Sequence, residues 1–193
     1  MDLTKNMFLA KYLKDMHTIT STDESLMRLL FYVAQNANDD VLDESRPDII
    51  GNTSYIESGN HEVGSALYED IIQDKIKMSS NADNLNVDDP TCQINLYFDA
   101  INPVNGTNGI VNKILLDLNI GIDMYVHREY DTIDARLFKI VSRLYELFYY
   151  KLVVGMGEFV MTYSAPITDK EETYDGFVGY RLKFKTRITA PYK

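Results

Sequence analysis

The spacing of apolar residues predicts one long helix in the second half of the chain. From 131 to 152, apolar residues recur at intervals of three, four and seven, which is the spacing of one helix face. The residues on this face are Ile133, Leu137, Ile140, Val141, Leu144, Leu147, Phe148 and Leu152. We therefore expect a helix over Asp131–Leu152, with Asp131 as its N-cap and Gly155 and Gly157 ending it. Its polar side would carry Arg136, Lys139, Arg143 and Glu146.

Alternation of apolar and polar residues predicts strands on both sides of that helix, at Cys92–Phe98, Leu118–His127 and Phe177–Ala190. Glu158–Ser164 is predicted as a further strand. In Phe177–Ala190, the last and longest, one face carries Val178, Tyr180, Leu182, Phe184, Thr186 and Ile188. The other face carries Gly179, Arg181, Lys183, Lys185 and Arg187. Such two-sided strands are typical of an antiparallel sheet with one buried face.

The N-terminal half is less regular. A short amphipathic helix is possible over 3–16, and Ser21 and Glu24 form a capping box that opens a helix at 22–37. Residues 38–90 are polar and acidic, with weak extended pieces at Asp48–Ile50 and Ser54–Ile56 and a short helical pattern at Val63–Met78.

These patterns together predict an α+β fold in a single domain, 1–193. A small, mainly antiparallel sheet would pack on one long helix within an α/β core at 91–190. Additional N-terminal helices would precede this core, and residues 38–90 would form an irregular acidic insertion or arm.

Composition limits the function classes. The chain of 193 residues is 45% hydrophobic and 25% charged, which is ordinary for a globular protein. Its net charge of −10 argues against a general nucleic-acid binder. A single cysteine excludes an intrachain disulfide, and no apolar run is long enough to cross a membrane.

Charge is distributed very unevenly. The last thirteen residues hold five basic and no acidic residues, whereas the other 180 hold 14 basic and 29 acidic residues. Four of these cations, Arg181, Lys183, Lys185 and Arg187, project from one face of the last predicted strand. They could protect a solvated edge strand, meet an acidic neighbour such as a second copy of this chain, or line a lumen and touch passing DNA.

The other candidate interaction residues are aromatic or acidic. Apolar contacts must supply most of the affinity of a subunit interface, because exposed ion pairs contribute only about 0–1 kcal/mol each. The aromatic candidates are Tyr180, Phe184, Phe148, Tyr149 and Tyr150. The acidic docking candidates are Asp39, Asp40, Asp43, Glu44 and Asp48, which lack the glycine and terminal glutamate of a calcium loop.

Residues that could carry chemistry are scattered. His17, His61 and His127 have no second ligand at a metal-binding spacing, and Cys92 lies on the apolar face of a predicted strand. Four carboxylates, Asp123, Glu129, Asp131 and Asp134, lie near His127, but no nucleophile accompanies them. We therefore expect no catalytic, cofactor or metal site.

The order of elements resembles the tail-terminator and head–tail joining proteins of tailed bacteriophages. The resemblance covers about Thr91–Ile188 and includes VHREY (Val126–Tyr130), GMGEFV and the closing GYRLKF (Gly179–Phe184). It implies a structural virion protein without enzymatic activity, assembled in the cytoplasm of the infected bacterial host. It also implies a homo-oligomeric ring, a hexamer or dodecamer, in contact with neck, portal or tail-tube proteins and not with a membrane. The competing hypotheses are a cellular adaptor and a small soluble enzyme.

Overall fold

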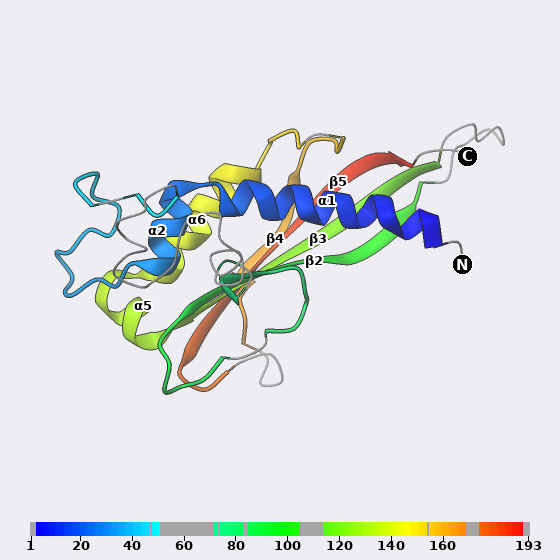
Figure 1. Ribbon diagram of the computed structural model, residues 1–193. Helices are drawn as coiled ribbons and strands as arrows, with labels where there is room; N and C mark the ends of the chain where they lie inside the picture. The colour runs from blue at the N-terminus through cyan, green and yellow to red at the C-terminus, as the bar shows by residue number, and fades with distance from the viewer. Residues whose placement is uncertain are drawn as a thin grey trace.

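The protein is represented by a computed structural model that describes residues 3–46, 48–50, 72, 74–82, 85–104, 114–153, 155–168 and 174–190 (Figure 1). The helices are α1 (Leu3–Ser21), α2 (Glu24–Phe31), α5 (Arg128–Asp134) and α6 (Arg136–Phe148). The strands are β1 (Ile76–Lys77), β2 (Cys92–Pro103), β3 (Ile114–His127), β4 (Val160–Pro166) and β5 (Phe177–Ala190).

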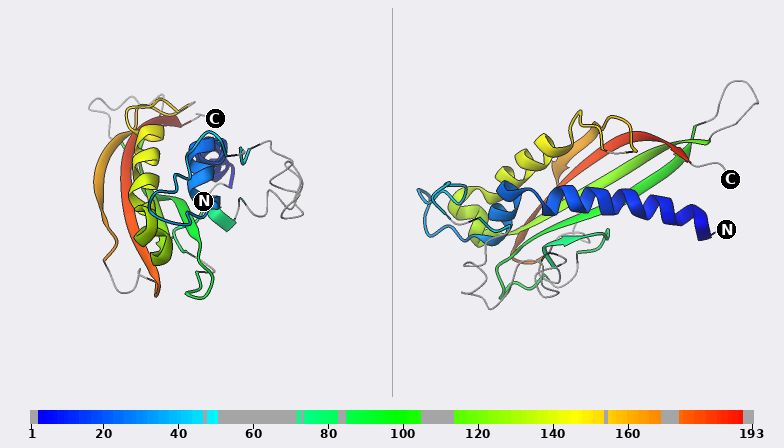
Figure 2. Two further views of the ribbon diagram at one scale, coloured as in Figure 1. Left: turned by 90° about the vertical axis from the view of Figure 1, so that its left-hand side faces the viewer. Right: turned by 45° about the horizontal axis from the view of Figure 1, so that its top comes forward.

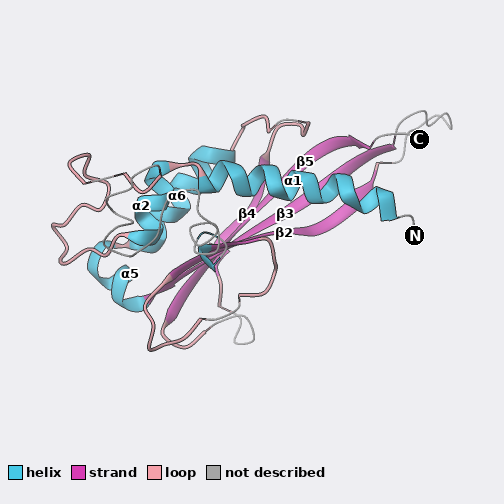
Figure 3. Ribbon diagram, in the orientation of Figure 1, coloured by secondary structure: helices cyan, strands magenta, loops and turns pink. Residues whose placement is uncertain are grey.

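The strands form one sheet in the order β1-β2-β3-β5-β4. Only the short β1–β2 pair is parallel, and the other pairs are antiparallel (Figure 3). The predicted α+β class with a mainly antiparallel sheet is therefore confirmed. The predicted strand Phe177–Ala190 is correct at both ends, because its alternation is uninterrupted. β2 and β3 are longer than predicted, and β4 begins two residues later.

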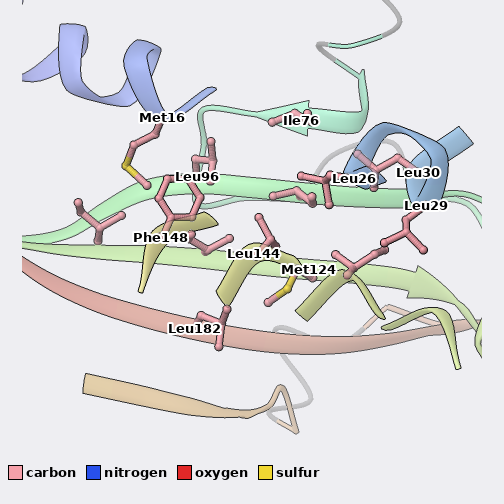
Figure 4. Packing of buried hydrophobic residues seen from close by; sticks show 14 of the residues in the cluster. Met16, Leu26, Leu29, Leu30, Ile76, Leu96, Met124, Leu144, Phe148 and Leu182 are labelled. Atoms are coloured by element: carbon pink, nitrogen blue, oxygen red, sulfur yellow. The ribbon is translucent and has the colours of Figure 1, made fainter. Parts of the chain in front are cut away.

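The helices lie on one face of the sheet. Figure 2 shows α6 against the strands, with α1 and α2 on the same side, and α6 contacts both β3 and β5. The core between these layers includes Leu96 of β2, Met124 of β3, Leu182 of β5 and Leu144 of α6 (Figure 4). The face of β5 predicted to be apolar points into this core, where Leu182, Phe184 and Ile188 are buried.

The predicted continuous helix over 131–152 is wrong, because the chain breaks at Ala135. Ala135 adopts the left-handed conformation, with φ of 53°, and separates α5 from α6. Asp131 does not cap the first helix; instead its carboxylate accepts a hydrogen bond of 2.9 Å from the N–H of Leu137 at the start of α6. His127 caps α5, and α6 ends at Phe148, well before the two glycines.

Arg136 was expected on the polar side of the helix, and this expectation is wrong. Its side chain is fully buried and donates 2.6 and 2.7 Å hydrogen bonds to the carbonyls of Leu29 and Tyr32, at the C-terminal end of α2. The buried carboxylate of Asp134 forms an ion pair with it at 2.9 Å. The break at Ala135 allows both charged side chains to reach this interior position.

The N-terminal helices also differ from the prediction. α1 runs on to Ser21, so Ser21 ends one helix and does not open the next. Asp23 caps α2 and accepts a hydrogen bond of 2.8 Å from the N–H of Leu26. The second helix is shorter than the predicted 22–37.

The predicted insertion is only partly described. Ser54–Ile56 and most of Val63–Met78 lie outside the described residues. Within the latter stretch Ile72, Asp74 and Lys75 are helical, as predicted, and the chain then enters β1 at Ile76. Asp48–Ile50 is described and is not a strand.

The buried face of α6 makes a stability prediction. Leu144 is fully buried, so Leu144→Ala should lower the free energy of unfolding by about 2–5 kcal/mol. Phe138→Ala on the same helix is the control, because Phe138 is 60% exposed and its loss should cost about 0.5 kcal/mol or less. Urea denaturation measures both. A loss below about 1 kcal/mol for Leu144→Ala would contradict the assigned core face.

The buried Arg136 makes a second prediction. Arg136→Met keeps the bulk of the side chain but leaves two carbonyl groups without their donor and Asp134 with the longer, 3.5 Å ion pair to Lys139, so it should cost about 3–5 kcal/mol. The double variant Asp134→Asn/Arg136→Met should be less destabilised than the sum of the single variants, because it removes the poorly compensated buried charge. Additive losses in urea denaturation would contradict this coupling.

Candidate functional site

The predicted basic row lies in the interior of the sheet, because β5 pairs with β3 on one side and β4 on the other. The edge-strand interpretation of this row is therefore wrong. The β3–β5 register places Asp123 opposite Arg181 and Asp117 opposite Arg187. The row thus faces carboxylates of its own sheet, on the face opposite the helices.

Each cation of the row has a carboxylate partner within the chain. Arg181 donates to both oxygens of Asp123 at 2.7 and 2.6 Å. Lys183 reaches Asp99 of β2 at 3.0 Å. Asp117 accepts from Lys185 at 2.9 Å and from Arg187 at 2.7 Å. Four cations and three carboxylates therefore form a nearly balanced charged face.

Burial and pairing change the acid–base behaviour of this face. The hydrogen bond from Arg187, and then that from Lys185, lowers the pKa of Asp117 to about 2. The hydroxyl of Tyr97 lies 3.2 Å from each oxygen of Asp123, and desolvation followed by this negative charge raises the pKa of Tyr97. The ring of Tyr97 lies over Gly121, where a side chain would collide with it.

The predicted aromatic candidates separate into buried and exposed groups. Phe148 and Phe184 are completely buried and pack with Phe159, with ring centroids 5.8–6.2 Å apart. They are core residues, so their prediction as interface candidates is wrong. Tyr149 and Tyr180 are half-buried, and Tyr150 is exposed.

Exposed apolar side chains gather around β4 on both sides of the sheet. The register places Val160 and Tyr163 on the charged face, beside Lys185 and Lys183, whereas Phe138 projects from α6 on the helix side. We call this set the apolar rim; its members are Phe138, Tyr150, Leu152, Val160 and Tyr163.

Contacts place both ends of the apolar rim against β4. At one end the N–H of Tyr150 bonds the carbonyl of Phe159 and Leu152 is bridged to Glu158, directly before β4. At the other end the ring of Phe138 lies 6.2 Å from that of Tyr180, whose hydroxyl is 3.0 Å from Ser164 of β4. Sequence periodicity missed this rim, although Val160–Pro166 contains no Asp, Glu, Lys, Arg or His.

Phe138 stands between two hollows of the surface. One, of about 370 Å³, extends from the start of α6 to the end of β4 and is lined partly by Asp131, Pro166 and Tyr180. The other, of about 410 Å³, lies between α6 and α2 and is lined partly by Ser142. Each hollow is an opening beside Phe138 that a side chain of a partner can enter.

The carboxylates of the enzyme hypothesis do not converge. Asp123 lies on the charged face, Asp134 is paired with Arg136, and Asp131 alone lines the 370 Å³ hollow. His127 uses Nδ1 to accept from the N–H of Glu129, while its Nε2 lies 3.2 Å from the carbonyl of Val87. These groups already have structural partners.

Cys92 and the possible metal ligands form no reactive site among the described residues. Cys92 is fully buried, as predicted, and burial raises the pKa of its thiol to about 11. In the described part of the chain, no three His, Cys, Asp or Glu side chains are arranged to hold a metal ion. None of the described helices combines the length and apolarity needed to cross a membrane.

The acidic segment is held against α2 by Arg28. This buried guanidinium donates to the carbonyls of Asp43 and Arg46 at 2.7 and 3.1 Å and to the carboxylate of Asp48 at 2.5 Å. Asp39 pairs with Arg46.

Two further acidic candidates remain open to a partner. Asp40 caps the local turn at Leu42, and both Asp40 and Glu44 are exposed. They are the members of the set placed best to meet another protein.

Comparison with known proteins places the chain among phage-derived proteins. The SPbeta prophage-derived protein YomW of Bacillus subtilis (strain 168) is 29% identical over 163 residues, which is 84% of this chain and 86% of that relative. A family model described as YomW matches residues 23–186, so the chain belongs to the YomW family. The phage affinity expected from the sequence pattern is confirmed at this level.

The charged face makes a pH-dependent prediction. The pKa of Asp117 lies below the unfolded value of about 4, so its ion pairs stabilise the fold above that pH and lose this effect as the pH falls to about 2. Asp117→Asn should lower Tm at pH 7, and its difference from the wild type should shrink as the pH falls through about 2, as followed by circular dichroism. Glu44→Gln, at an exposed site, is the control. A difference in Tm that stays undiminished over this pH range would show that packing, not charge, causes the loss.

Proposed function

We propose that this chain is a structural protein of a phage particle that assembles with copies of itself into a ring. The ring, a hexamer or dodecamer, would act at the neck or tail junction as a tail terminator or head–tail connector. The observation that carries this proposal is the apolar rim beside an open sheet edge. Membership of a phage-derived family and the resemblance of its element order to tail-terminator proteins support the same function.

In this proposal the apolar rim, and not the basic row, holds neighbouring subunits together. Because the row is already paired with Asp99, Asp117 and Asp123, it has little charge left to attract an acidic neighbour. Burying Leu152 and Tyr150 at a subunit contact would release apolar surface from water, worth about 25 cal/mol per Å² before the costs of association.

The charged face then becomes the surface that lines the lumen. Its near balance of four cations and three carboxylates would let DNA pass without holding it, because strong binding to phosphates needs an excess of cations. Neck, portal or tail-tube proteins would contact the two ends of the ring, and exposed Asp40 and Glu44 are available for such contacts.

The function requires no catalysis, and we propose that the protein is not an enzyme. Asp123, Asp131 and Asp134 are engaged in capping or ion pairs, and Glu129 is exposed at the start of α5. It would be present in the virion after assembly in the cytoplasm of the infected host.

Self-assembly is tested by size-exclusion chromatography with light scattering. The wild type should exceed the 22.2 kDa monomer mass, and more so at moderate salt, which screens the repulsion between chains of charge −10. Leu152→Glu should shift the protein to monomers. Val33→Glu is the matched control, because Val33 is also exposed but lies outside the apolar rim.

Two results would contradict the proposal. One is a 22.2 kDa monomer at every protein and salt concentration. The other is an antibody against the chain that labels purified phage particles nowhere near the neck or tail junction in electron micrographs.

A further inference from the structure

The outer edge of β4 lacks charged residues, and its protection is limited to a bulge and the terminal Pro166. Natural edge strands avoid pairing with other chains by carrying charged residues, by being very short, or by bulging. β4 is seven residues long, contains no charged residue, and exposes Val160 and Tyr163. Its one irregularity is a bulge between Met161 and Tyr163 on the side of β5.

The sheet has a second open edge at the far end of β2. β1 pairs with β2 only at Ile94 and Asn95, so among the described residues no strand covers the outer edge from Leu96 to Pro103. That stretch of eight residues is close in length to β4. Its single carboxylate, Asp99, is already neutralised by Lys183 of the same chain.

The directions of the strands make these two edges compatible. β2 is antiparallel to β3, β3 to β5, and β5 to β4, so β2 and β4 run in opposite directions. Copies related by rotation about a ring axis keep their orientation along that axis. The β4 edge of one copy therefore meets the β2 edge of the next copy as an antiparallel pair.

We propose that β4 of one copy pairs with the outer edge of β2, Leu96–Pro103, of the next copy, so that one sheet continues from subunit to subunit around the ring. This inference rests on the proposed self-assembly and specifies its contact. The helices of every copy stay on one side of the shared sheet, and the charged faces stay on the other. When the ring closes, both open edges are paired, so neither can pair with unrelated chains and cause aggregation.

Charge favours a second copy of this chain as the occupant. Two chains of net charge −10 repel one another, so a stable contact must exclude unpaired carboxylates. The β4 edge has none, and the β2 edge has only the paired Asp99. The exposed Leu152 lies beside the first residues of β4 and adds apolar area next to the strand pair.

Two variants, each blocking one edge, test the pairing. Tyr163→Glu places a charge on β4, and Ile101→Glu places one on the β2 edge; both side chains are exposed, so both variants should fold, as judged by circular dichroism and Tm. Sedimentation velocity should find each variant monomeric at 22.2 kDa. An equal mixture should form one-to-one pairs and nothing larger, because only one intact β4 edge and one intact β2 edge can then meet. Tyr163→Phe is the matched control and should assemble like the wild type.

The outcomes separate this inference from the proposed function. A monomeric wild type would overturn the self-assembling ring. A wild-type ring together with unaffected rings of both variants would overturn only the strand pairing. Dimers of Ile101→Glu alone would show a two-fold β4–β4 contact instead, and a mixture that stays monomeric would also exclude the β4–β2 pair.

A crosslinking measurement gives an independent readout. Asn102 lies opposite Asp117 and Tyr163 opposite Lys183, so both project from the charged face. In the double variant Asn102→Cys/Tyr163→Cys, a short bismaleimide should join one copy to the next and produce a ladder of covalent oligomers. Glu146→Cys/Tyr163→Cys, with the first cysteine on the exposed side of α6, should not. The native Cys92 is buried and does not compete. Equal crosslinking of both variants would overturn the pairing.

Discussion

The buried guanidinium of Arg136 connects the start of α6 to the end of α2. It links the turn between α5 and α6 to the C-terminal end of α2, where it bonds the carbonyls of Leu29 and Tyr32. The last carbonyls of a helix have no partner within that helix, and here an arginine more than 100 residues away satisfies them. The ion pair with Asp134 compensates the charge that burial would otherwise make costly. The position of α6 on the sheet, and hence of Phe138 in the apolar rim, depends on this contact.

Strand pairing compensates the basic residues of β5, which in the linear sequence look like a docking surface for an acidic partner. The four basic residues of β5 are distant in sequence from the acidic residues, but the β3–β5 register brings Asp117 and Asp123 beside them. A count of charges cannot reveal this, since it ignores which strands pair. The four cations of the row are compensated within the chain, whereas the β4 edge carries no charge and exposes apolar side chains.

Local patterns predicted the elements well and the long-range contacts poorly. The span of β5 is correct because alternation depends only on near neighbours in the chain. The break at Ala135 and the burial of Arg136 were missed because their cause lies at Leu29 and Tyr32. The burial of Phe148 does not follow from the local sequence, because an aromatic residue at a helix end can point either way. The apolar rim did leave a signal, the absence of charge in Val160–Pro166, and that signal is visible without a structure.

The position of Cys92 gives the protein an internal reporter. It is the only thiol in the chain, and it is fully buried in β2, between the helices and the sheet. A reagent can reach it only when that layer opens, so its alkylation rate measures how often the fold separates. Because the thiol belongs to the strand whose outer edge is open, the same rate compared between free chain and assembled particle reports how firmly the neighbours hold that strand in place. The alkylation rate of this single thiol therefore measures how much assembly slows the opening of the fold.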